Sequence, residues 1–219
     1  MSADPLVAFF DRRARAYDRQ LWLERRALRT AARLAEPLAG ARVVDLATGT
    51  GALAAALIRR DDRIARLTGV DAAPQMLDRA RPRVAPLGQR AGLVRGDVRQ
   101  LPLPDADADV VTIGYLLHLL APTARAQTLA EALRVLRPGG RLVAVVHGSP
   151  PGRAGRAYRG AWRGVSRIVP SAVIGEGPMA DLAPVVADAG FRVEATVRLS
   201  GLYWSQVLQA RRPEERSIS

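Results

Sequence analysis

The sequence contains neither cysteine nor lysine. Without cysteine the chain cannot form disulfides, zinc–thiolate sites, iron–sulfur clusters or a cysteine nucleophile. Without lysine it cannot be a P-loop protein, a pyridoxal enzyme with a Schiff-base lysine, or a short-chain dehydrogenase with a Tyr/Lys pair. Several cofactor chemistries are therefore excluded before any motif is considered.

Asparagine is absent as well, and all 33 basic residues are arginine, which leaves a formal net charge of +12. Such a charge would suit nucleic acid or an anionic membrane. A chain without lysine or asparagine is more typical of a bias toward GC-rich codons than of selection for a binding surface. We therefore expect a small-molecule substrate, with a nucleic-acid-binding or RNA-modifying protein as the alternative from another class.

The sequence also lacks a long apolar run. Its longest apolar stretch, near residues 110–121, is too short to span a bilayer, and the N-terminus shows no cleavable apolar region. The 219 residues suit one domain with a sizeable core. We expect a cytoplasmic protein without a metal site, and the oligomeric state stays open.

Short apolar runs rich in β-branched residues alternate with helical patterns along the chain. Strands are predicted at 41–46, 64–71, 92–96, 108–114, 141–147, 192–199 and 203–210. Helices are predicted at 52–60, 74–84 and 123–136, preceded by two amphipathic helices at 5–18 and 21–36. The pattern predicts an α/β fold: a doubly wound, mostly parallel seven-stranded sheet with an antiparallel C-terminal hairpin and an N-terminal helical lid.

The segment VVDLATGTGAL, residues 43–53, combines a strand that ends in a carboxylate with two glycines and a following helix. Glycine lets a ligand approach the backbone closely, and the N-terminus of a helix offers free N–H groups. Gly49, Gly51 and Ala54 fit the dinucleotide pattern G-x-G-x-x-A, and Asp71 lies where a carboxylate would hold ribose hydroxyls. NAD is therefore one interpretation of the motif.

Three other features favour S-adenosylmethionine. Asp45 would repel a pyrophosphate but would help to hold the ammonium group of a methionine moiety. Asp97 ends the third predicted strand, where it can accept a hydrogen bond from an adenine amino group while the N–H of Val98 donates to the ring. Residues 138–140, Pro-Gly-Gly, predict a turn before the fifth strand.

Four segments carry a family resemblance: DLATGTG, GVDAAPQML, GDVRQLPLPDADADVVTI and EALRVLRPGGRLV. In this order and spacing they resemble a class I S-adenosylmethionine-dependent methyltransferase, and they are most similar to the ubiquinone/menaquinone biosynthesis C-methyltransferase family (methyltransferase type 11-like). The terminal segments FDRRARAYD and LSGLYWSQVLQARRP match that family too, so the similarity covers nearly the whole chain. The chain reads GYLLHLL where the quinone enzymes carry an arginine–asparagine pair, which leaves the acceptor open.

The resemblance implies a lid at 1–40, a cofactor-binding domain at 41–219 and a substrate cap near 149–178. It also implies a set of cofactor-binding residues: Asp45, Ala47, Thr48, Gly49 and Gly51 around the methionine portion, Asp71 on the ribose, Ala72 and Met76 beside the adenine, Asp97 and Val98 at its edge, and the carbonyl of Gly114 toward the amino group. Tyr17 and Trp22, on the N-terminal helices, would cover the cofactor or simply pack in the core.

Methyl transfer to a small molecule depends chiefly on alignment and on the exclusion of water. If the acceptor must lose a proton, His118 and His147 are the candidate bases, while Tyr115 would hydrogen-bond the substrate or close the core. We expect methylation of a largely apolar aromatic, quinone-like or polyketide-like acceptor at carbon or oxygen. The alternative within this fold is a tailoring enzyme that uses the pocket for cyclisation or decarboxylation.

The predicted cap contains a basic amphipathic pattern. Alanines 154, 157 and 161 recur at helical spacing with Val165 and Ile168, and arginines occupy another face. Residues 153–169 would make peripheral contact with a membrane, face an anionic substrate, or form a solvated helix that packs by its apolar side.

Overall fold

The computed structural model describes residues 5–18, 21–165, 177–201 and 203–214. Within these residues seven strands form one sheet in the order β3-β2-β1-β4-β5-β7-β6. The strands are β1 (Arg42–Leu46), β2 (Arg66–Asp71), β3 (Ala91–Arg95), β4 (Ala108–Gly114), β5 (Leu136–His147), β6 (Arg192–Leu199) and β7 (Ser205–Arg211). The first five are parallel, and β7 runs antiparallel between β5 and β6. The predicted fold class is confirmed.

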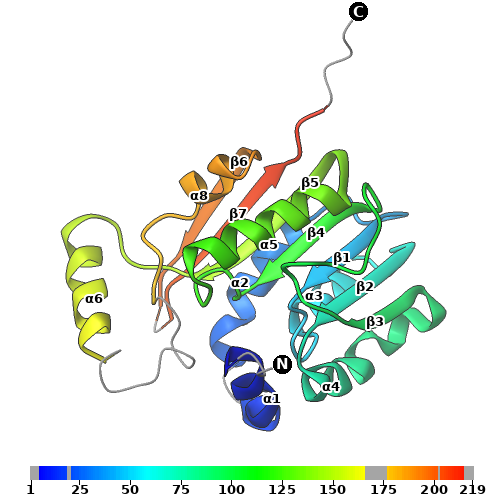
Figure 1. The fold of residues 1–219 in the computed structure, drawn as a ribbon, viewed down its shortest axis with the longest axis horizontal. Helices are drawn as coiled ribbons and strands as arrows, with labels where there is room; N and C mark the ends of the chain where they lie inside the picture. The colour runs from blue at the N-terminus through cyan, green and yellow to red at the C-terminus, as the bar shows by residue number, and fades with distance from the viewer. Residues whose placement is uncertain (1–4, 19–20, 166–176, 202, 215–219) are drawn as a thin grey trace, which may run out of the picture.

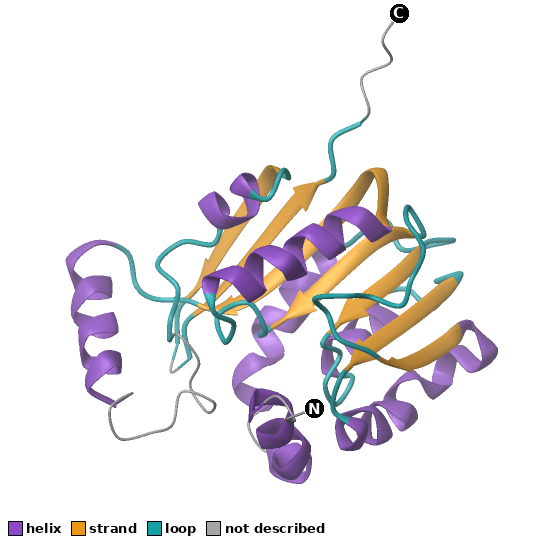
Figure 2. Cartoon of the chain, viewed as in Figure 1, coloured by secondary structure: helices purple, strands orange, loops and turns teal. Residues whose placement is uncertain are grey.

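Helices cover both faces of this sheet (Figures 1 and 2). They are α1 (Pro5–Tyr17), α2 (Leu21–Leu34), α3 (Ala52–Arg60), α4 (Pro74–Val84), the 3₁₀ helix η2 (Ala85–Arg90), α5 (Pro122–Val135), α6 (Gly152–Val165) and α8 (Ala183–Asp188). One core cluster joins α2 and α3 to the sheet, and a second joins α5 and α8 to its other face. No helix in the described part of the chain is both long and apolar enough to cross a membrane.

The alternation of side chains along β5 explains why this strand appears as a continuous apolar run. Val143 and Val145 belong to the cluster with α2 and α3, whereas Leu142, Ala144 and Val146 belong to the cluster with α5. All five are fully buried. Successive side chains point to opposite faces, so a strand with both faces covered must be apolar at every position.

The start of β5 differs from the prediction. The strand begins at Leu136, which pairs with Ala108, and the pairing then jumps to Arg141 opposite Val110. The predicted Pro-Gly-Gly turn therefore forms a bulge inside the strand rather than a turn before it. Gly139 adopts a φ of 72° in this bulge.

The two N-terminal helices have different roles in the fold. Ala27, Leu28 and Ala31 place α2 in the main core, with at most 6% of each side chain exposed. In contrast, α1 contacts α4, where Asp11 Oδ1 accepts a hydrogen bond of 2.9 Å from the N–H of Gln75. In the described part of the chain, α2 is therefore a layer of the domain, whereas α1 packs outside the main core.

Candidate functional site

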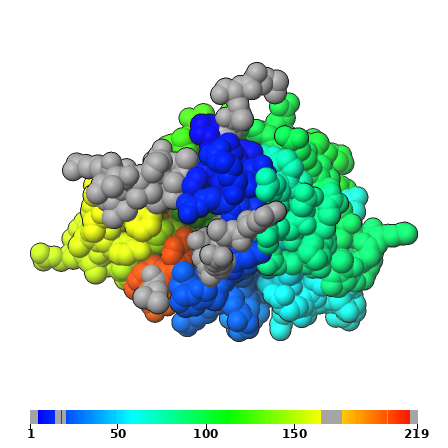
Figure 3. Space-filling view, turned by 90° about the horizontal axis from the view of Figure 1, so that it is seen from below, coloured from blue at the N-terminus to red at the C-terminus, as the bar shows by residue number. Residues whose placement is uncertain are grey.

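A cavity opens at the carboxyl ends of β1, β2 and β4, on the end of the molecule where α1 lies against α4 (Figure 3). Its empty volume, including the open mouth, is about 1060 Å³. In open α/β sheets, ligands bind at this end of the strands.

The fold brings most of the predicted site residues together around this cavity, although they come from four separate segments of the sequence. Those that line it are Asp45, Ala47, Thr48, Gly49, Asp71, Ala72, Met76, Asp97, Val98, Gly114 and Tyr115. The side chain of Tyr17 lies outside the described part of the structure.

Asp71 connects the glycine turn to the end of β2. Its Oδ2 accepts a hydrogen bond of 2.8 Å from the N–H of Gly49, and its Oδ1 accepts one of 2.9 Å from Ala73. A Cβ on Gly69 would lie 3.0 Å from the Thr48 side chain, so a glycine in β2 lets the turn pack closely on the strand. Because each carboxylate oxygen has two lone pairs, Asp71 can hold the turn and still accept a ligand hydroxyl.

Gly51 is the predicted glycine that does not line the cavity. Its φ is 79°, and a Cβ there would lie 3.1 Å from Ala80 on α4. Glycine at this position therefore permits the left-handed turn and the close packing of α3 against α4, rather than the approach of a ligand.

Asp45 is a buried carboxylate beneath the glycine turn, with 1% of its surface exposed. It accepts hydrogen bonds from the hydroxyls of Thr112 at 2.6 Å and Thr48 at 2.7 Å. Burial raises its pKa to about 6, and the two hydroxyl bonds oppose this shift. Burial also raises the pKa of Asp71, against the opposing effect of its backbone hydrogen bonds.

Asp97 differs from the other two acids because it is more exposed and forms an ion pair. Its carboxylate accepts hydrogen bonds from the guanidinium of Arg99, the shortest at 2.7 Å, and from the Arg99 backbone N–H at 2.8 Å. The Arg99 hydrogen bond lowers the pKa of Asp97. The group is therefore ionised at neutral pH.

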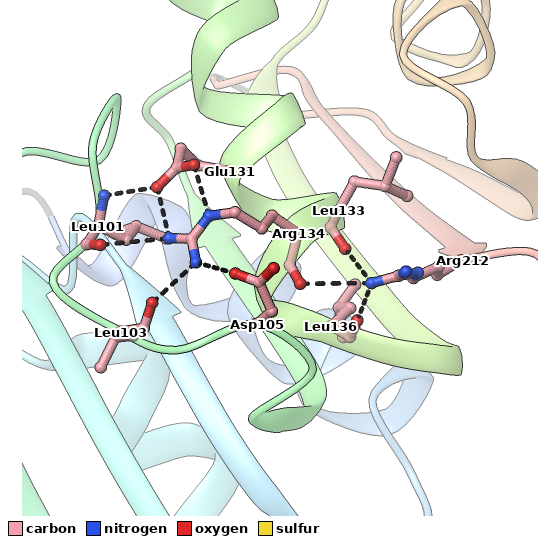
Figure 4. A network of polar contacts seen from close by, with 8 residues as sticks. All are labelled: Leu101, Leu103, Asp105, Glu131, Leu133, Arg134, Leu136 and Arg212. Atoms are coloured by element: carbon pink, nitrogen blue, oxygen red, sulfur yellow. Dashed lines mark hydrogen bonds and ion pairs between the residues drawn. The ribbon is translucent and has the colours of Figure 1, made fainter.

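The segment that follows Asp97 is held in place by Arg134 of α5 (Figure 4). The Arg134 guanidinium donates to the carbonyls of Leu103 at 2.9 Å and Leu101 at 3.2 Å, and it pairs with Asp105 and Glu131. Arg212 of the chain after β7 donates to three carbonyls at the end of α5, namely those of Leu133, Arg134 and Leu136. These contacts position the loop from β3 to β4 and with it the rim of the cavity.

Two residues beside the cavity adopt left-handed backbone conformations that are uncommon for residues other than glycine. Ala47, after β1, has a φ of 50°, and Tyr115, after β4, has a φ of 53°. Each such conformation costs of the order of 1 kcal/mol. The N–H of Tyr115 donates to the carbonyl of Val145, and its hydroxyl is 2.7 Å from Ser205 Oγ. This strain lies at the two strand ends that shape the cavity.

The two histidines lie close to each other but are not part of the cavity lining. The backbone N–H of His147 donates to His118 Nδ1 at 3.4 Å, its Nε2 is 3.1 Å from the Tyr158 hydroxyl, and its ring stacks on Tyr203. Burial lowers the pKa of His118 to about 3 and that of His147 to about 4. Both rings are therefore neutral at neutral pH.

Two expectations about exposed helices are wrong. Trp22 is 62% exposed, so it neither covers the cavity nor packs in the core. On α6 the predicted alanine stripe is exposed, while Gly155 is buried and Tyr158 and Trp162 are half-buried. Aromatic rings bury more area than alanines, so they determine which face of the helix packs. Residues 166–176 of the predicted cap lie outside the described residues.

Several cavity residues were not identified from the sequence. Leu6 and Val7 of α1 and Leu119 and Leu120 after β4 are among them. A second group lies on α2 and consists of Leu21, Glu24 and Leu28. The spacing of these three positions puts Glu24 in an apolar stripe, a signal that the surrounding arginines obscured.

The charges around the cavity are mainly negative. Glu24, Asp45, Asp71 and Asp97 contribute carboxylates, and Arg99 contributes the opposing charge among the lining residues. This arrangement suits a cationic ligand, and it disfavours the pyrophosphate of a dinucleotide. A ligand with a positive sulfonium and an ammonium group fits the residues present.

Comparison with known proteins agrees with this geometry. Residues 43–140 match the family described as methyltransferase domain. A demethylmenaquinone methyltransferase of Thermus thermophilus is 42% identical over 132 residues, which cover 60% of this chain and 59% of that protein. The matches cover less than two thirds of the length of each of these relatives in sequence.

Two solved structures extend the comparison to the fold. The S-adenosylmethionine-dependent methyltransferase SibL is 25% identical with a TM-score of 0.66, and the match covers 84% of this chain and 54% of SibL. The [4+2]-cyclase SpnF is 19% identical with a TM-score of 0.68, and the match covers 87% of this chain and 82% of SpnF.

The fold is similar to that of the S-adenosylmethionine-dependent methyltransferase SibL. Over residues 43–140 this chain carries a methyltransferase domain, and in sequence it is similar to the demethylmenaquinone methyltransferases.

Proposed function

We propose that the whole chain transfers a methyl group from S-adenosylmethionine to a small, largely apolar acceptor, at carbon or oxygen. The observation that carries this proposal is the cavity at the strand ends, which combines a glycine turn, a surplus of carboxylates and an apolar wall. When bound, the sulfonium cofactor supplies an activated methyl group. The chain has to align the acceptor with it and exclude water.

In this proposal, the residues around the glycine turn hold the methionine portion. Asp45 attracts the ammonium group, and the turn at Ala47, Thr48 and Gly49 contacts the same portion through its backbone. Gly51 supports the turn from below through its packing on α4. Asp71 accepts hydrogen bonds from the ribose hydroxyls while it keeps its bonds to the turn.

The adenine would lie between Ala72 and Met76, with Asp97 and Val98 at its edge and the Gly114 carbonyl near the cofactor's amino group. Met76 is 3% exposed and packs with Ala73 and Ala14, which supports an apolar contact on this side. Tyr17 and the rest of α1 would then cover the cofactor, so we restrict the lid within residues 1–40 to this helix. The cap near 149–178 would close the other side.

The nature of the acceptor is the finer part of the proposal. The relative named as a demethylmenaquinone methyltransferase supports a quinone-like acceptor, and the apolar side chains of α1 and α2 support an apolar one. Exposed arginines on α6, such as Arg153 and Arg156, agree with peripheral contact with an anionic membrane through 153–169.

Calorimetry with three ligands tests the cofactor. We expect S-adenosylmethionine and S-adenosylhomocysteine to bind and NAD not to bind. Asp71→Ala should weaken the binding of both sulfur ligands by roughly 1.5–3 kcal/mol, because a hydrogen bond to a charged group has that size. Comparable affinity for NAD, or no heat with either sulfur ligand, would contradict the proposal.

A second candidate is cyclisation of a bound natural product without methyl transfer. SpnF has the same fold and is a cyclase, which is the observation in its favour. Incubation with methyl-labelled cofactor and a panel of phenols, quinols and polyketides separates the two. A labelled product one methyl group heavier supports transfer, and a rearranged product of unchanged mass supports the second candidate.

A further inference from the structure

Thr112 is a polar residue in a fully buried part of the sheet. It lies in β4 between Val111 and Ile113, and none of the three has any exposed surface. Because β4 pairs with β1 on one side and β5 on the other, it is a central strand, and such strands are normally apolar on both faces. A hydroxyl buried there needs a hydrogen-bond partner, since its burial without one is unfavourable. The fold provides a carboxylate as that partner.

The parallel register of β1 and β4 places Thr112 beside Asp45, and the Thr112 hydroxyl donates to Asp45 Oδ1 at 2.6 Å. On the other side of β1, the residue in register with Asp45 is Gly69. A Cβ on Gly69 would lie 3.0 Å from the side chain of Thr48, whose hydroxyl donates to Asp45 Oδ2 at 2.7 Å. The backbone N–H of Ala54 in α3 is a third donor to this carboxylate. Each oxygen of Asp45 is thus held by a hydroxyl from a different segment.

The two hydroxyls stand in different relations to the cavity. Asp45 and Thr48 line it, whereas Thr112 is not among the described residues that do so. Thr112 therefore acts on a ligand through Asp45. A hydroxyl donates to an ionised carboxylate and accepts from a protonated one, so both hydroxyls can remain bonded when Asp45 changes its protonation state.

The hydrogen bonds favour the ionised form of Asp45 against two opposing effects. Burial raises the pKa of Asp45 to about 6, and among the described residues Asp71 of β2 contributes a negative charge that acts in the same direction. The bonds from β4, the glycine turn and α3 lower this pKa, and the bond from Thr112 has the largest effect of the three. Thr112 thus counters the cost of an ionised carboxylate at a buried position.

We propose that Thr112 is a positioning residue whose hydroxyl holds Asp45 in its ionised form and thereby sets the pH below which the site loses S-adenosylmethionine. Without this hydroxyl, Asp45 is protonated more readily, and the neutral carboxyl no longer attracts the ammonium group of the cofactor. The inference rests on the proposed function, which assigns the ammonium group to Asp45, and it adds a regulation of the same site.

The test follows the titration of Asp45 in two ways in the full chain. Carbon NMR of protein labelled at the aspartate carboxyls observes the group without a ligand, and Asp45→Asn assigns its signal. Calorimetry measures the binding of S-adenosylhomocysteine from about pH 5 to about pH 8.5, a range that brackets the pKa of about 6.

The variant Thr112→Val removes the hydroxyl and keeps the branched shape of the side chain. We expect the NMR midpoint, and the pH at which affinity begins to fall, to rise by about one pH unit, because a hydrogen bond to a charged group contributes at least that much. At about pH 8.5 the variant should bind S-adenosylhomocysteine within about threefold of the wild type, since Asp45 is then ionised in both.

Two further variants serve as controls. Thr112→Ser keeps the hydroxyl and should retain the wild-type titration. Thr128→Val is the matched change, because Thr128 is equally buried but donates to the carbonyl of Ala124 in its own helix at 2.8 Å. It should leave the titration of Asp45 and the binding of S-adenosylhomocysteine unchanged. A cooperative urea transition in each variant shows that it is folded.

The role of Thr112 is overturned if Asp45 titrates at the wild-type pH in Thr112→Val, or if Thr112→Ser or Thr128→Val shifts the midpoint as far. A failure of the proposed function gives a different result. In that case the NMR midpoint of Asp45 still moves in Thr112→Val, while S-adenosylhomocysteine does not bind or binds with the same affinity at every pH.

Discussion

Burial shifts the pKa values of several side chains in this domain, and Asp45 shows the effect most directly. Its pKa is about 6 in the folded chain, compared with an ordinary value of 3.8. The folded protein thus binds this proton more tightly than the unfolded chain does, so ionisation destabilises the fold between about pH 4 and pH 6. The ionised Asp45 carboxylate would attract a cationic cofactor, so the loss of folding stability would be offset by a gain in cofactor binding.

We expect Asp45→Asn to be more stable than the wild type at pH 7, by up to about 3 kcal/mol, and equally stable near pH 4. Cofactor affinity should change in the opposite direction. In the wild type it should fall as the pH is lowered through about 6, whereas Asp45→Asn should bind weakly at every pH. Urea titrations and calorimetry at pH 4, 6 and 7 measure both effects, and a pH-independent wild-type affinity would contradict the role of Asp45.

His118 and His147 affect the pH dependence of stability in the direction opposite to Asp45, because they lower the free energy of unfolding as the pH falls. Their folded pKa values, about 3 and about 4, lie below the ordinary value of 6.5, so the unfolded chain binds protons first as the pH falls. The contribution of the two neutral imidazoles to the free energy of unfolding is therefore complete above about pH 6.5. It decreases below that pH, by roughly 2 kcal/mol per histidine at pH 5. His118→Gln should reduce the difference in urea midpoint between pH 7 and pH 5. An unchanged difference would show that the ring is charged in the folded state.

The same burial bears on catalysis. A histidine with a pKa near 3 or 4, outside the cavity lining, is a weak base that is remote from the proposed reactants. We therefore favour alignment over base catalysis by either ring. His118→Ala should stay within roughly tenfold of the wild-type rate, without an ascending limb near pH 6.5. A pH-dependent loss of about 10²-fold or more would restore His118 as the base.

Among the secondary-structure elements, α5 controls the rim of the cavity through Arg134. Its guanidinium bonds to Leu101, Leu103, Asp105 and Glu131, so Arg134→Ala would remove one hydrogen-bond donor from two carbonyls and two carboxylates. We expect a loss of roughly 2–3 kcal/mol of stability and weaker cofactor binding. Arg137→Ala, which removes an exposed pair with Asp109, is the control and should cost less than about 1 kcal/mol. Equal losses of stability in the two variants would contradict the role of Arg134 in holding the loop from β3 to β4.

The helix α1 is the element best suited to move. It packs on α4 through a small cluster of Ala14, Ala73 and Met76, and two ion pairs at 3.0 and 3.1 Å join Asp18 to α4. Removal of residues 1–17 should leave a cooperative thermal transition, because the main core begins with α2. Turnover should be weak or absent, since the cover that excludes water is gone. A shortened chain with full activity would refute the lid.

At the scale of the whole molecule, the net charge of +12 gathers partly in a groove between α2 and α3. The groove is lined by Trp22, Arg25, Arg26, Arg29, Ala32, Arg33, Ala56, Arg59 and Arg60. We expect weak, sequence-independent retention of duplex DNA at about 50 mM salt that disappears by about 200 mM. Gel shifts at the two salt concentrations measure this. Binding that persists at high salt would favour the alternative of a nucleic-acid-binding protein.

The order and type of the elements around the cavity could be predicted from the sequence alone. The strand at 108–114 and the helices at 52–60 and 74–84 match the structure residue for residue, because local apolar periodicity and proline at a helix start are encoded in adjacent residues. The acids at the strand ends could likewise be predicted as site residues, because the carboxyl ends of parallel strands lie at the same edge of the sheet.

The other features of the fold and the site depend on contacts between residues far apart in the chain, so they could not be predicted from local sequence patterns. The position of β7 between β5 and β6 depends on pairing with β5 between residues that are 58 to 70 positions apart. The packing of Gly51 on Ala80, the burial of both histidines and the exposure of Trp22 follow from which helices meet. Glu24 enters the cavity for the same reason: a helical stripe predicts a buried face, but the opposing elements decide whether that face meets core or ligand.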